Sequence, residues 1–351
     1  MESDDRIKGY VSSYDDRIGE IRMEGIGQMD SGLPLVSVVT LTYRHFDTLY
    51  KTIASVLEQE YPNIQYIICD DGSDNFPRSE IESFIRDRNS SFDIVIEHNE
   101  KNQGTVKNIN HAYKLAKGKY IMNLSAGDIF FEKETVGKVV KEFERRKCDV
   151  LVTSRILYKG DLEPDSLLPH YRDRKRIAKW DTPDKQRRAF VTSFFYDMAS
   201  GSAMYFTNDV MKKYNYFDEK YVLWEDGPFI NRYMMDHKIE CAYDIVSIWY
   251  EDGGVSNSGN IHPLLYADLI KFNHGDKLIG TEKYSRFDKM KIAYRNACVE
   301  SKGRKQWLCI KIRYFPVFIC NIFRFLGNKR NIRVDRSIIE KILNQDRSHN
   351  G

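Results

Sequence analysis

Ile64-Gln-Tyr-Ile-Ile-Cys-Asp-Asp-Gly-Ser73 is the stretch of sequence that decides the fold. Its first six residues form a short, largely apolar run with the character of a buried β-strand. Two carboxylates, Asp70 and Asp71, follow directly, so we expect them just past the carboxyl end of that strand. In an open α/β sheet this edge is where ligands bind. The stretch therefore predicts an α/β protein with an acidic binding site at the edge of its sheet.

Strand-like and helix-like segments alternate on both sides of this stretch. Residues 35–42 are rich in β-branched side chains, as in a buried parallel strand, and residues 46–58 carry apolar side chains at helical spacing. The alternation continues with predicted helices over 77–88, 105–116 and 133–146 and predicted strands over 92–97, 119–124 and 148–153. This rhythm predicts a mostly parallel sheet with helices on both faces.

The rhythm breaks between residues 155 and 196, which we interpret as an insertion or a flexible lid because the charged run 172–176 fits neither period. Beyond this segment we predict strands over 202–206 and 239–250. We predict helices over 208–214, from about 225, and between 263 and 299. Before the first strand, residues 1–33 are polar and dotted with glycine. This start favours a loosely ordered leader, and a short helical arm is the alternative.

The charge is unevenly distributed along an otherwise ordinary globular composition. Of the 351 residues, 30% are charged and 42% are hydrophobic, and the formal net charge is +3. Residues 302–351 carry twelve Lys and Arg against three Asp and Glu, so the basic charge gathers at one end. A nucleic-acid binder would be basic across its working face, so we expect no nucleic-acid partner.

The cysteines and the first residues indicate a cytoplasmic protein. None of the six cysteines shows C-x-x-C spacing or accompanies a His cluster, which disfavours a zinc site and fits a reducing compartment. The first residues show neither a basic n-region nor an apolar h-region, so no signal peptide is predicted. No uncharged stretch reaches the roughly 18–20 residues that span a bilayer.

A second acidic pair, Glu225-Asp226, lies at the start of a helical pattern. A helix N-terminus within a cleft can tune a carboxylate for acid–base catalysis. Together the two pairs suggest group transfer from a nucleotide-activated donor. Each has a plain structural alternative, since Asp-Gly-Ser is common in turns and an acidic helix start is favourable with the macrodipole.

Eight segments of the chain, in order, resemble those of the family 2 inverting glycosyltransferases. The resemblance covers roughly residues 34–260 and depends on the order and spacing of the segments. They are Val36-Ser-Val-Val-Thr-Leu-Thr-Tyr43, Ile53-Ala-Ser-Val-Leu-Glu-Gln59, Asp70-Asp-Gly-Ser73, Asn102-Gln-Gly-Thr-Val-Lys-Asn108, Ala116-Lys-Gly-Lys-Tyr-Ile121, Leu124-Ser-Ala-Gly-Asp128, Phe217-Asp-Glu219 and Glu225-Asp226.

This resemblance implies a GT-A fold and a non-processive transferase. The catalytic domain would span 34–260, with a nucleotide-sugar half at 34–153 and an acceptor half at 154–260. Residues 1–33 would be the polar leader and residues 261–351 a helical, basic C-terminal region. The implied reaction moves a sugar from a nucleoside diphosphate sugar, which we expect to be a UDP-sugar, to a saccharide or a lipid-linked glycan in surface polysaccharide biosynthesis.

The resemblance also implies roles for individual residues. Asp226 would be the general base and Glu225 would orient the acceptor. Tyr43 would lie against the donor base and Asp71 would bind its uracil-type edge, with Asp70 beside it. The full set implied for donor binding is Thr42, Tyr43, Asp70, Asp71, Lys107, Ser125, Ala126 and Gly127. For Lys107 an exposed helix face is an equal alternative.

The segment 124–128 departs from the family pattern, which commonly shows an Asp-x-Asp triplet followed by another Asp. Ser125 and Gly127 stand at the triplet positions, and only Asp128 keeps a carboxylate. One Asp together with a diphosphate can still hold Mn²⁺ or Mg²⁺, so we expect metal dependence with weak affinity in the absence of nucleotide. The glycine-rich loop 253–257 and His262 could close over the diphosphate, with His262 as a further metal ligand, although a lone histidine is often structural.

Residues 307–333 combine apolar and aromatic side chains with several Lys and Arg. Their charges and Pro316 argue against a spanning helix. An interfacial segment on the cytoplasmic face of a membrane and a helix packed on the catalytic domain are both open.

Two other function classes stay open. A catalytically silent relative that binds sugar nucleotide or acts as a scaffold is suggested by the missing triplet carboxylates. A nucleotidyltransferase is the alternative enzyme, but the first strand-to-helix turn lacks a glycine-rich phosphate loop.

Overall fold

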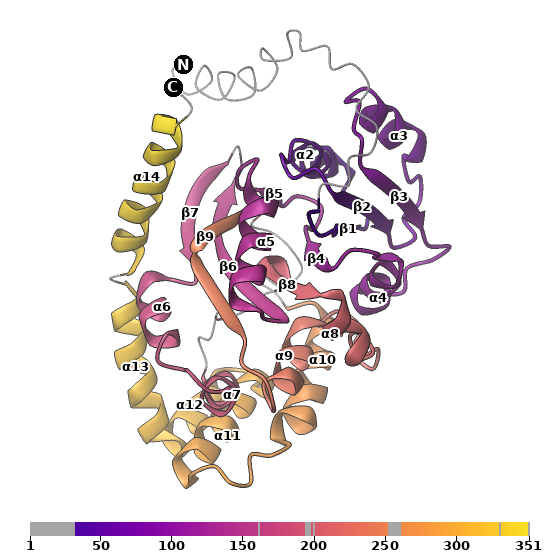
Figure 1. The fold of residues 1–351 in the computed structure, drawn as a ribbon. Helices are drawn as coiled ribbons and strands as arrows, with labels where there is room; N and C mark the ends of the chain where they lie inside the picture. Colours follow the sequence, from indigo (N-terminus) through magenta and orange to yellow (C-terminus); the bar gives the residue numbers. More distant parts are fainter. Residues whose placement is uncertain are drawn as a thin grey trace.

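The computed structural model describes residues 32–160, 162–193, 198, 201–251, 261–329 and 331–349. Within these ranges nine strands form one sheet, in the order β3-β2-β1-β4-β8-β6-β9-β5, with β7 paired to β6 (Figure 1). The strands are β1 (Val36–Thr42), β2 (Ile64–Asp70), β3 (Asp93–His98), β4 (Tyr120–Asn123), β5 (Ile129–Phe130), β6 (Val150–Lys159), β7 (Glu163–Leu168), β8 (Met204–Thr207) and β9 (Glu240–Glu251). The predicted leader and the loop 253–257 lie outside the described residues.

The sheet changes character along its width. Strands β3, β2, β1 and β4 pair in parallel, so their carboxyl ends meet at one edge. Beyond β4 the pairing is mixed, because β8 is antiparallel to both β4 and β6, whereas β6 and β9 are parallel. The predicted α/β class is confirmed, and the parallel pairing that positions Asp70 and Asp71 lies in the first half of the chain.

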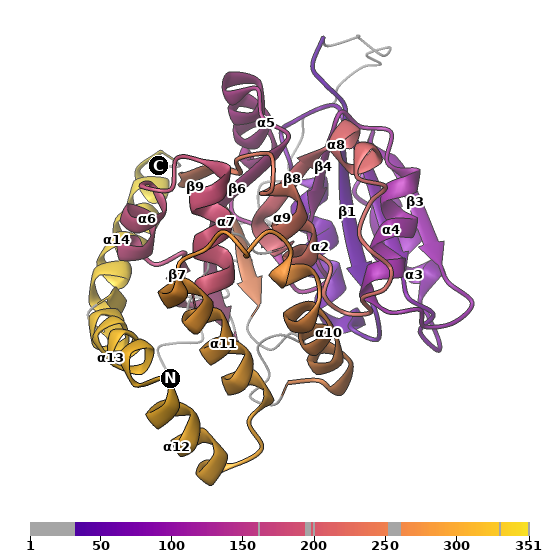
Figure 2. The ribbon, with the colours of Figure 1, turned by 90° about the horizontal axis from the view of Figure 1, so that it is seen from below.

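Helices cover both faces of the sheet (Figures 1 and 2). One apolar core joins the sheet to α2 (Phe46–Leu57), α3 (Arg78–Arg86) and α5 (Thr135–Arg146). The core on the other face contains residues of α4 (Thr105–Leu115), α6 (Tyr171–Ile177), α7 (Pro183–Thr192), α8 (Asn208–Lys213), α9 (Asp226–Tyr233), α10 (Pro263–His274) and α11 (Arg286–Glu300). Successive strand residues enter opposite cores, as Val38 and Val39 of β1 do, because side chains alternate across a strand.

The predicted elements from 35 to 146 agree with the structure to within two residues at each boundary. The strand expected to end at 153 instead continues to Lys159 and turns back as β7, which pairs antiparallel with it. The charged run 172–176 is part of α6, where the Arg174 guanidinium donates hydrogen bonds to the carbonyls of Pro169 and Tyr243. Where described, the segment interpreted as a lid is therefore a hairpin and two helices. Sequence periodicity missed them because the helices are short and β7 lies at an edge.

The C-terminal part of the chain is helical. Two 3₁₀ turns, η1 (Gly201–Ala203) and η2 (Asp276–Leu278), precede α11, and the last helices are α12 (Arg304–Arg313), α13 (Phe315–Lys329) and α14 (Asn331–His349). In both ribbon views α12 and α13 lie on the side of the molecule away from β1–β3. Across the described part of the chain, we find no helix with the length and apolar character needed to cross a membrane.

Candidate active site

Asp70 ends β2 as a fully buried carboxylate that closes the following turn. Its oxygens accept hydrogen bonds from the Ser73 hydroxyl at 2.6 Å and from the Ser73 backbone N–H at 2.7 Å. The Nδ1 atom of His98, at the end of β3, lies 2.8 Å from Asp70 Oδ2. Asp70 therefore holds the turn and joins the ends of two strands.

Asp71 attaches the loop before α4 to the end of β2. Its Oδ1 accepts hydrogen bonds from the backbone N–H of Gln103 at 2.9 Å and from Asn99 Nδ2 at 3.2 Å. Its Oδ2 accepts from the Gly104 N–H at 2.9 Å. Gly104 has φ +89°, and a Cβ there would lie 2.8 Å from the carbonyl oxygen of Val222. Asp71 and Gly104 thus hold the start of α4 against the segment that leads to Glu225.

Thr42 and Tyr43 lie at the end of β1, beside this turn. The carbonyl of Thr42 accepts a hydrogen bond from the Asp71 N–H at 3.0 Å. Its side chain is 4% exposed, and the hydroxyl has no hydrogen-bond partner among the described residues. Tyr43 is half-buried, with the Arg44 guanidinium 5.0 Å from its ring centroid. Lys107 is exposed in the first turn of α4.

The segment after β4 runs beside the end of β1, where the Ala126 N–H donates to the carbonyl of Leu41 at 3.0 Å. Ser125 is exposed and Ala126 partly buried. Gly127 has φ +99°, and a Cβ there would lie 1.9 Å from Glu251 Oε2. The positive φ favours glycine at this position, and a side chain here would displace the Glu251 carboxylate at the end of β9.

Asp128 is a buried carboxylate with one oxygen left without a partner. Its side chain is 3% exposed, and Oδ1 accepts a hydrogen bond from the Glu251 N–H at 3.0 Å. Oδ2 is buried and has no hydrogen-bond partner in the described part of the chain. The pKa of Asp128 is raised to about 8, chiefly by burial; the hydrogen bond from the Glu251 N–H and the charge of Arg155 lower it, and the charge of Glu251 adds a smaller rise.

This arrangement fits a divalent cation. A buried, unpartnered carboxylate oxygen next to a second carboxylate offers the hard oxygen ligands that Mg²⁺ and Mn²⁺ take. The described residues contain no group of three or more His, Cys, Asp or Glu side chains that could hold a metal. Asp128 and Glu251 would therefore need further ligands from a bound molecule.

His262 is exposed and caps α10, where its Nδ1 accepts a hydrogen bond from the Leu264 N–H at 3.3 Å. Its role as a metal ligand stays a prediction.

Glu225 and Asp226 begin α9 and are partly buried. Asp226 accepts hydrogen bonds from the backbone N–H of Gly201 at 2.8 Å and of Gly227 at 2.6 Å. The pKa of Glu225 is raised to about 8, chiefly by burial and next by the charge of the neighbouring Asp226. Burial also raises the pKa of Asp226, but hydrogen bonds from Gly201, Gly227 and Trp224 and the charge of Arg155 counteract it. The negative charge of the pair is therefore favoured on Asp226.

Three further residues support this pair, and sequence reasoning missed them. A Cβ on Gly201 would lie 2.8 Å from Glu225 Oε1 and 3.5 Å from Asp226 Oδ2. Asn123, the last residue of β4, donates to the Gly201 carbonyl at 3.2 Å. Asp268 of α10, which is 1% exposed, accepts hydrogen bonds from the backbone N–H groups of 222, 223 and 224 at 2.8, 2.7 and 3.2 Å. No local motif marks any of the three.

Arg155 of β6 acts electrostatically on both Asp128 and Asp226. It is 6% exposed, and its positive charge lowers the pKa of both Asp128 and Asp226. Its guanidinium also lies 5.3 Å from the ring centroid of Tyr250. The sequence placed this position at the start of an unassigned segment, so nothing marked it. The fold thus brings Asp128, Glu251, Arg155 and Asp226 into one site.

The chain matches a known enzyme family. The family model described as "Glycosyl transferase family 2" matches residues 37–214, from β1 to the end of α8, which is just over half of the chain. The chain belongs to this family. It is a glycosyltransferase, and the predicted family is confirmed.

Relatives and solved structures agree with this membership. An uncharacterized glycosyltransferase of Methanocaldococcus jannaschii is 28% identical over 86% of this chain and 90% of its own length. The Escherichia coli enzyme named UDP-Glc:alpha-D-GlcNAc-diphosphoundecaprenol beta-1,3-glucosyltransferase WfaP is 38% identical over 27% of this chain and 36% of its own length, so that similarity covers only part of the enzyme. The structure of Staphylococcus aureus TarS 1–349 in complex with UDP-GlcNAc aligns with a TM-score of 0.55 and 17% identity, covering 81% of each chain. This likeness confirms the GT-A-type fold.

Proposed function

We propose that this glycosyltransferase moves a sugar from a UDP-sugar to a saccharide or lipid-linked glycan acceptor, with inversion at the anomeric carbon. The observation that carries the proposal is the pair of carboxylate sites around Arg155. One site, Asp128 with Glu251, is suited to a cation on a diphosphate, and the other, Glu225 with Asp226, is suited to a base. The relatives named for UDP-linked sugars support the choice of donor.

The donor nucleotide would bind at the ends of β1 and β2. Both oxygens of Asp71 accept backbone hydrogen bonds, yet a carboxylate has about four acceptor sites, so it can also accept from a pyrimidine N–H. The unpartnered hydroxyl of Thr42 and the ring of Tyr43 lie beside it, and the ring offers a stacking surface. Asp70, which is buried and held by Ser73 and His98, would shape the turn without touching the donor.

The diphosphate would lie over the segment 125–128. Ser125, Ala126 and Gly127 present backbone to it, and a Mn²⁺ or Mg²⁺ ion held by Asp128 and Glu251 would neutralise charge that develops on the leaving diphosphate. Arg155 supplies a fixed positive charge at the same place. Lys107 and His262 stay candidate donor and metal contacts.

Asp226 would act as the general base. The acceptor hydroxyl oxygen attacks the anomeric carbon from the face opposite the diphosphate, and the bond from that carbon to the diphosphate oxygen breaks. The hydroxyl proton passes to the Asp226 carboxylate, and the diphosphate leaves with the bonding electrons. Burial and the charge of Asp226 raise the pKa of Glu225, which favours its protonated form, and as an acid it can donate a hydrogen bond that orients the acceptor.

We further propose surface polysaccharide biosynthesis on the cytoplasmic side of a membrane as the setting. The lipid-linked acceptor in the name of the Escherichia coli relative supports this setting, as does the name of a putative teichuronic acid biosynthesis glycosyltransferase of Bacillus subtilis, which is 30% identical over 39% of this chain and 52% of its own length. Residues 34–153 would be the donor half and 154–260 the acceptor half. Asp268 ties the helical region 261–351 to the acceptor half, because it holds the backbone before Glu225.

Calorimetric titration with UDP, GDP and a panel of their sugars, with and without Mn²⁺, tests the donor side. We expect manganese-dependent binding of UDP and its sugars. Transfer to lipid-linked and free saccharides, followed by the anomeric configuration of the product, tests the reaction. An absence of nucleotide binding under every condition would instead favour the silent relative.

A further inference from the structure

The C-terminal helices differ in how they meet the rest of the protein. α14 packs on the outer part of the sheet, where Ile339 is buried in a cluster with Trp249 of β9 and Leu167 of β7. Asp335 of α14 accepts a hydrogen bond from the backbone N–H of Tyr171 at 3.1 Å, and its Oδ2 lies 2.5 Å from His170 Nδ1. The end of the chain is therefore attached to the catalytic domain.

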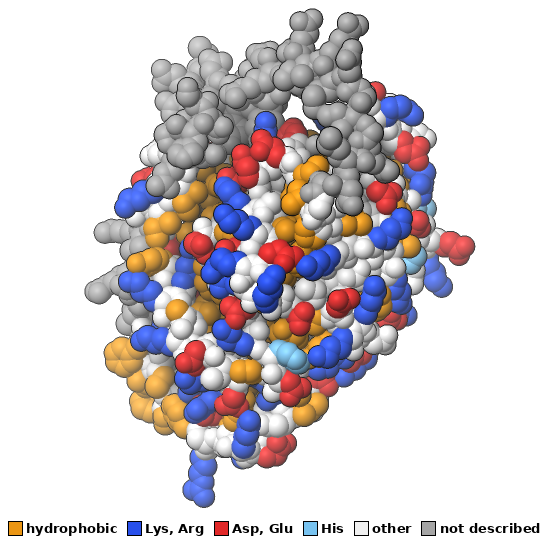
Figure 3. All heavy atoms as spheres, in the orientation of Figure 1, with side chains coloured by type: hydrophobic (Ala, Val, Ile, Leu, Met, Phe, Trp, Pro, Cys, Tyr) orange, Lys and Arg blue, Asp and Glu red, His pale blue; other side chains and the backbone are white. Residues whose placement is uncertain are grey.

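α12 and the first part of α13 leave their apolar side chains in solvent. Ile310 is the only buried residue of α12. The apolar side chains on this surface are 46–71% exposed and belong to Trp307, Leu308, Ile312, Phe315 and Phe323. Figure 3 shows hydrophobic side chains gathered at the lower left, where Figure 1 places α12 and α13. We call this surface the α12–α13 face.

The α12–α13 face mixes apolar and basic side chains in a helical register. Arg304, Trp307, Leu308, Lys311 and Ile312 are spaced so that they share one side of α12. The Lys311 ammonium lies 2.8 Å from the ring centroid of Trp307. Residues 301–323 contain five Lys and Arg and no Asp or Glu. The face therefore complements a negatively charged, apolar partner.

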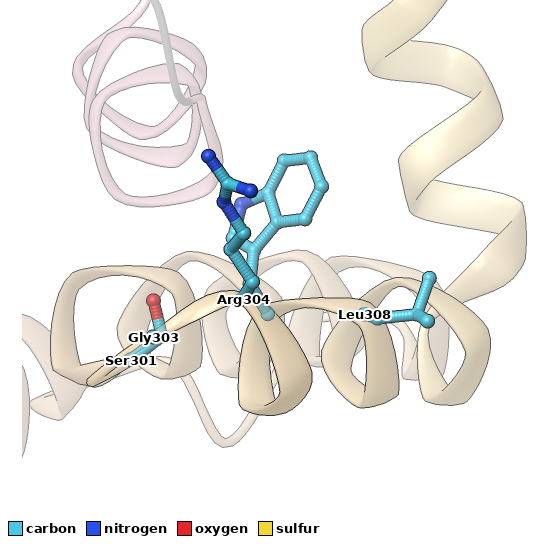
Figure 4. Close-up of a pocket in the computed structure, with 5 residues that line it drawn as sticks. Ser301, Gly303, Arg304 and Leu308 are labelled. Carbon is cyan, nitrogen blue, oxygen red and sulfur yellow. The ribbon is translucent and has the colours of Figure 1, made fainter.

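A hollow opens at the start of this helix. It has a volume of about 630 Å³ and is lined by Ser301, Gly303, Arg304, Trp307 and Leu308. Figure 4 shows Arg304 rising from α12 at this hollow, with Leu308 one turn further along. A guanidinium beside aromatic and aliphatic walls suits a phosphate group joined to an acyl chain.

We propose that the α12–α13 face docks on the surface of a bilayer that contains anionic lipids. A helical surface that exposes aromatic, aliphatic and basic side chains together can lie in the interface, where it binds through buried apolar area and attraction to anionic head groups. α14 holds this face on the outside of the domain, so docking would bring the whole enzyme to the membrane. Vesicle binding needs neither donor nor acceptor, so it tests this inference independently of the proposed reaction.

Co-sedimentation of the full chain with vesicles tests the proposal. We expect binding to equimolar phosphatidylcholine and phosphatidylglycerol that is about tenfold tighter than binding to phosphatidylcholine alone, and that weakens with salt. The double variant Ile312→Asp, Phe315→Asp should bind the anionic vesicles about tenfold more weakly or not at all. The matched control is Ile279→Asp, because Ile279 is 52% exposed on a different surface and its substitution should leave vesicle binding unchanged. Circular dichroism and nucleotide binding establish that each variant is folded.

Two outcomes would overturn the proposal. One is equal binding, or no binding, of the folded wild-type protein to the two kinds of vesicle. The other is a concentration-dependent dimer that the double variant abolishes without a change in vesicle binding, because the α12–α13 face would then be occupied by a second copy of the chain.

Discussion

The two adjacent acidic pairs of this protein, Asp70–Asp71 and Glu225–Asp226, are alike in sequence and differ in how the fold holds them. Five hydrogen bonds from N–H and O–H groups reach the first pair, and His98 lies against it as well. The second pair is partly exposed, receives backbone hydrogen bonds mainly on Asp226, and leaves Glu225 with a pKa near 8.

This difference distinguishes carboxylates that hold the backbone in place from carboxylates that can take part in proton transfer. A carboxylate whose lone pairs are used by neighbouring donors holds backbone in place. A carboxylate whose charge is disfavoured by burial and by a neighbour can take up a proton at neutral pH. Asp70 belongs to the first kind and Glu225–Asp226 to the second, whereas Asp71 combines a structural contact with a proposed binding role.

The largest effect is expected at the proposed base. Asp226→Asn should lower kcat roughly 10³-fold, since a general base typically contributes 10²–10⁴-fold, while the Kd of UDP changes little. Glu225→Gln is the matched control: glutamine resembles the protonated acid, so we expect less than a tenfold loss. Single-turnover transfer assays and calorimetry measure the two effects. A larger loss for Glu225→Gln than for Asp226→Asn would reverse the assignment of the base.

The next effect concerns the proposed metal site formed by Asp128 and Glu251. Asp128→Asn should weaken manganese-dependent UDP binding by about 10–100-fold and leave the metal-independent part unchanged. Glu251→Gln should show the same pattern with a smaller loss. Calorimetric titration with and without Mn²⁺ measures both. If Glu251→Gln behaves as wild type while Asp128→Asn loses the metal effect, Glu251 is no ligand.

Substitution in the first pair, Asp70–Asp71, should mainly change the stability of the fold. Asp70→Asn should lower the free energy of unfolding by about 1–3 kcal/mol, because it leaves buried donors badly paired. The control Asp74→Asn removes only an exposed ion pair with Arg44 and should cost less than about 1 kcal/mol. Urea unfolding measures both. Equal stability of the two variants would contradict the structural role of Asp70.

A separate effect is a pH dependence of stability that arises from Glu225. Its folded-state pKa lies above the unfolded value, so its contribution to stability is present below about pH 4 and is lost as pH rises through 8. The free energy of unfolding should therefore fall across this range by at most about 1.4 kcal/mol per pH unit. Glu225→Gln should remove this contribution, and so make the fall in stability shallower in urea unfolding at a series of pH values, while the similar contribution of Asp128 stays. An unchanged slope would show that Glu225 titrates normally in the fold.

The sequence predicted those elements and candidate residues that are marked by a local pattern along the chain. The alternation of apolar runs and helical spacings predicted the elements from β1 to α5 except β5, and the acidic residues after β2 and β4 and those at the start of α9 were identified as candidates. Glu251, Gly201 and Asp268 were missed, because each joins the site through a neighbour that is distant in sequence. β5, of two residues, and β7, an edge strand, were also too weakly patterned to predict.

By itself the sequence determined the period of each element and the order of the carboxylates, because these depend on neighbouring residues along the chain. Only the tertiary structure decided which carboxylates are saturated and which are left to react. Antiparallel pairing of β5 with β9 brings Glu251 against Gly127, and the buried Arg155 acts with one positive charge on both Asp128 and Asp226. Desolvation and hydrogen bonding depend on what packs around a group, and that is decided by contacts between residues far apart in the chain.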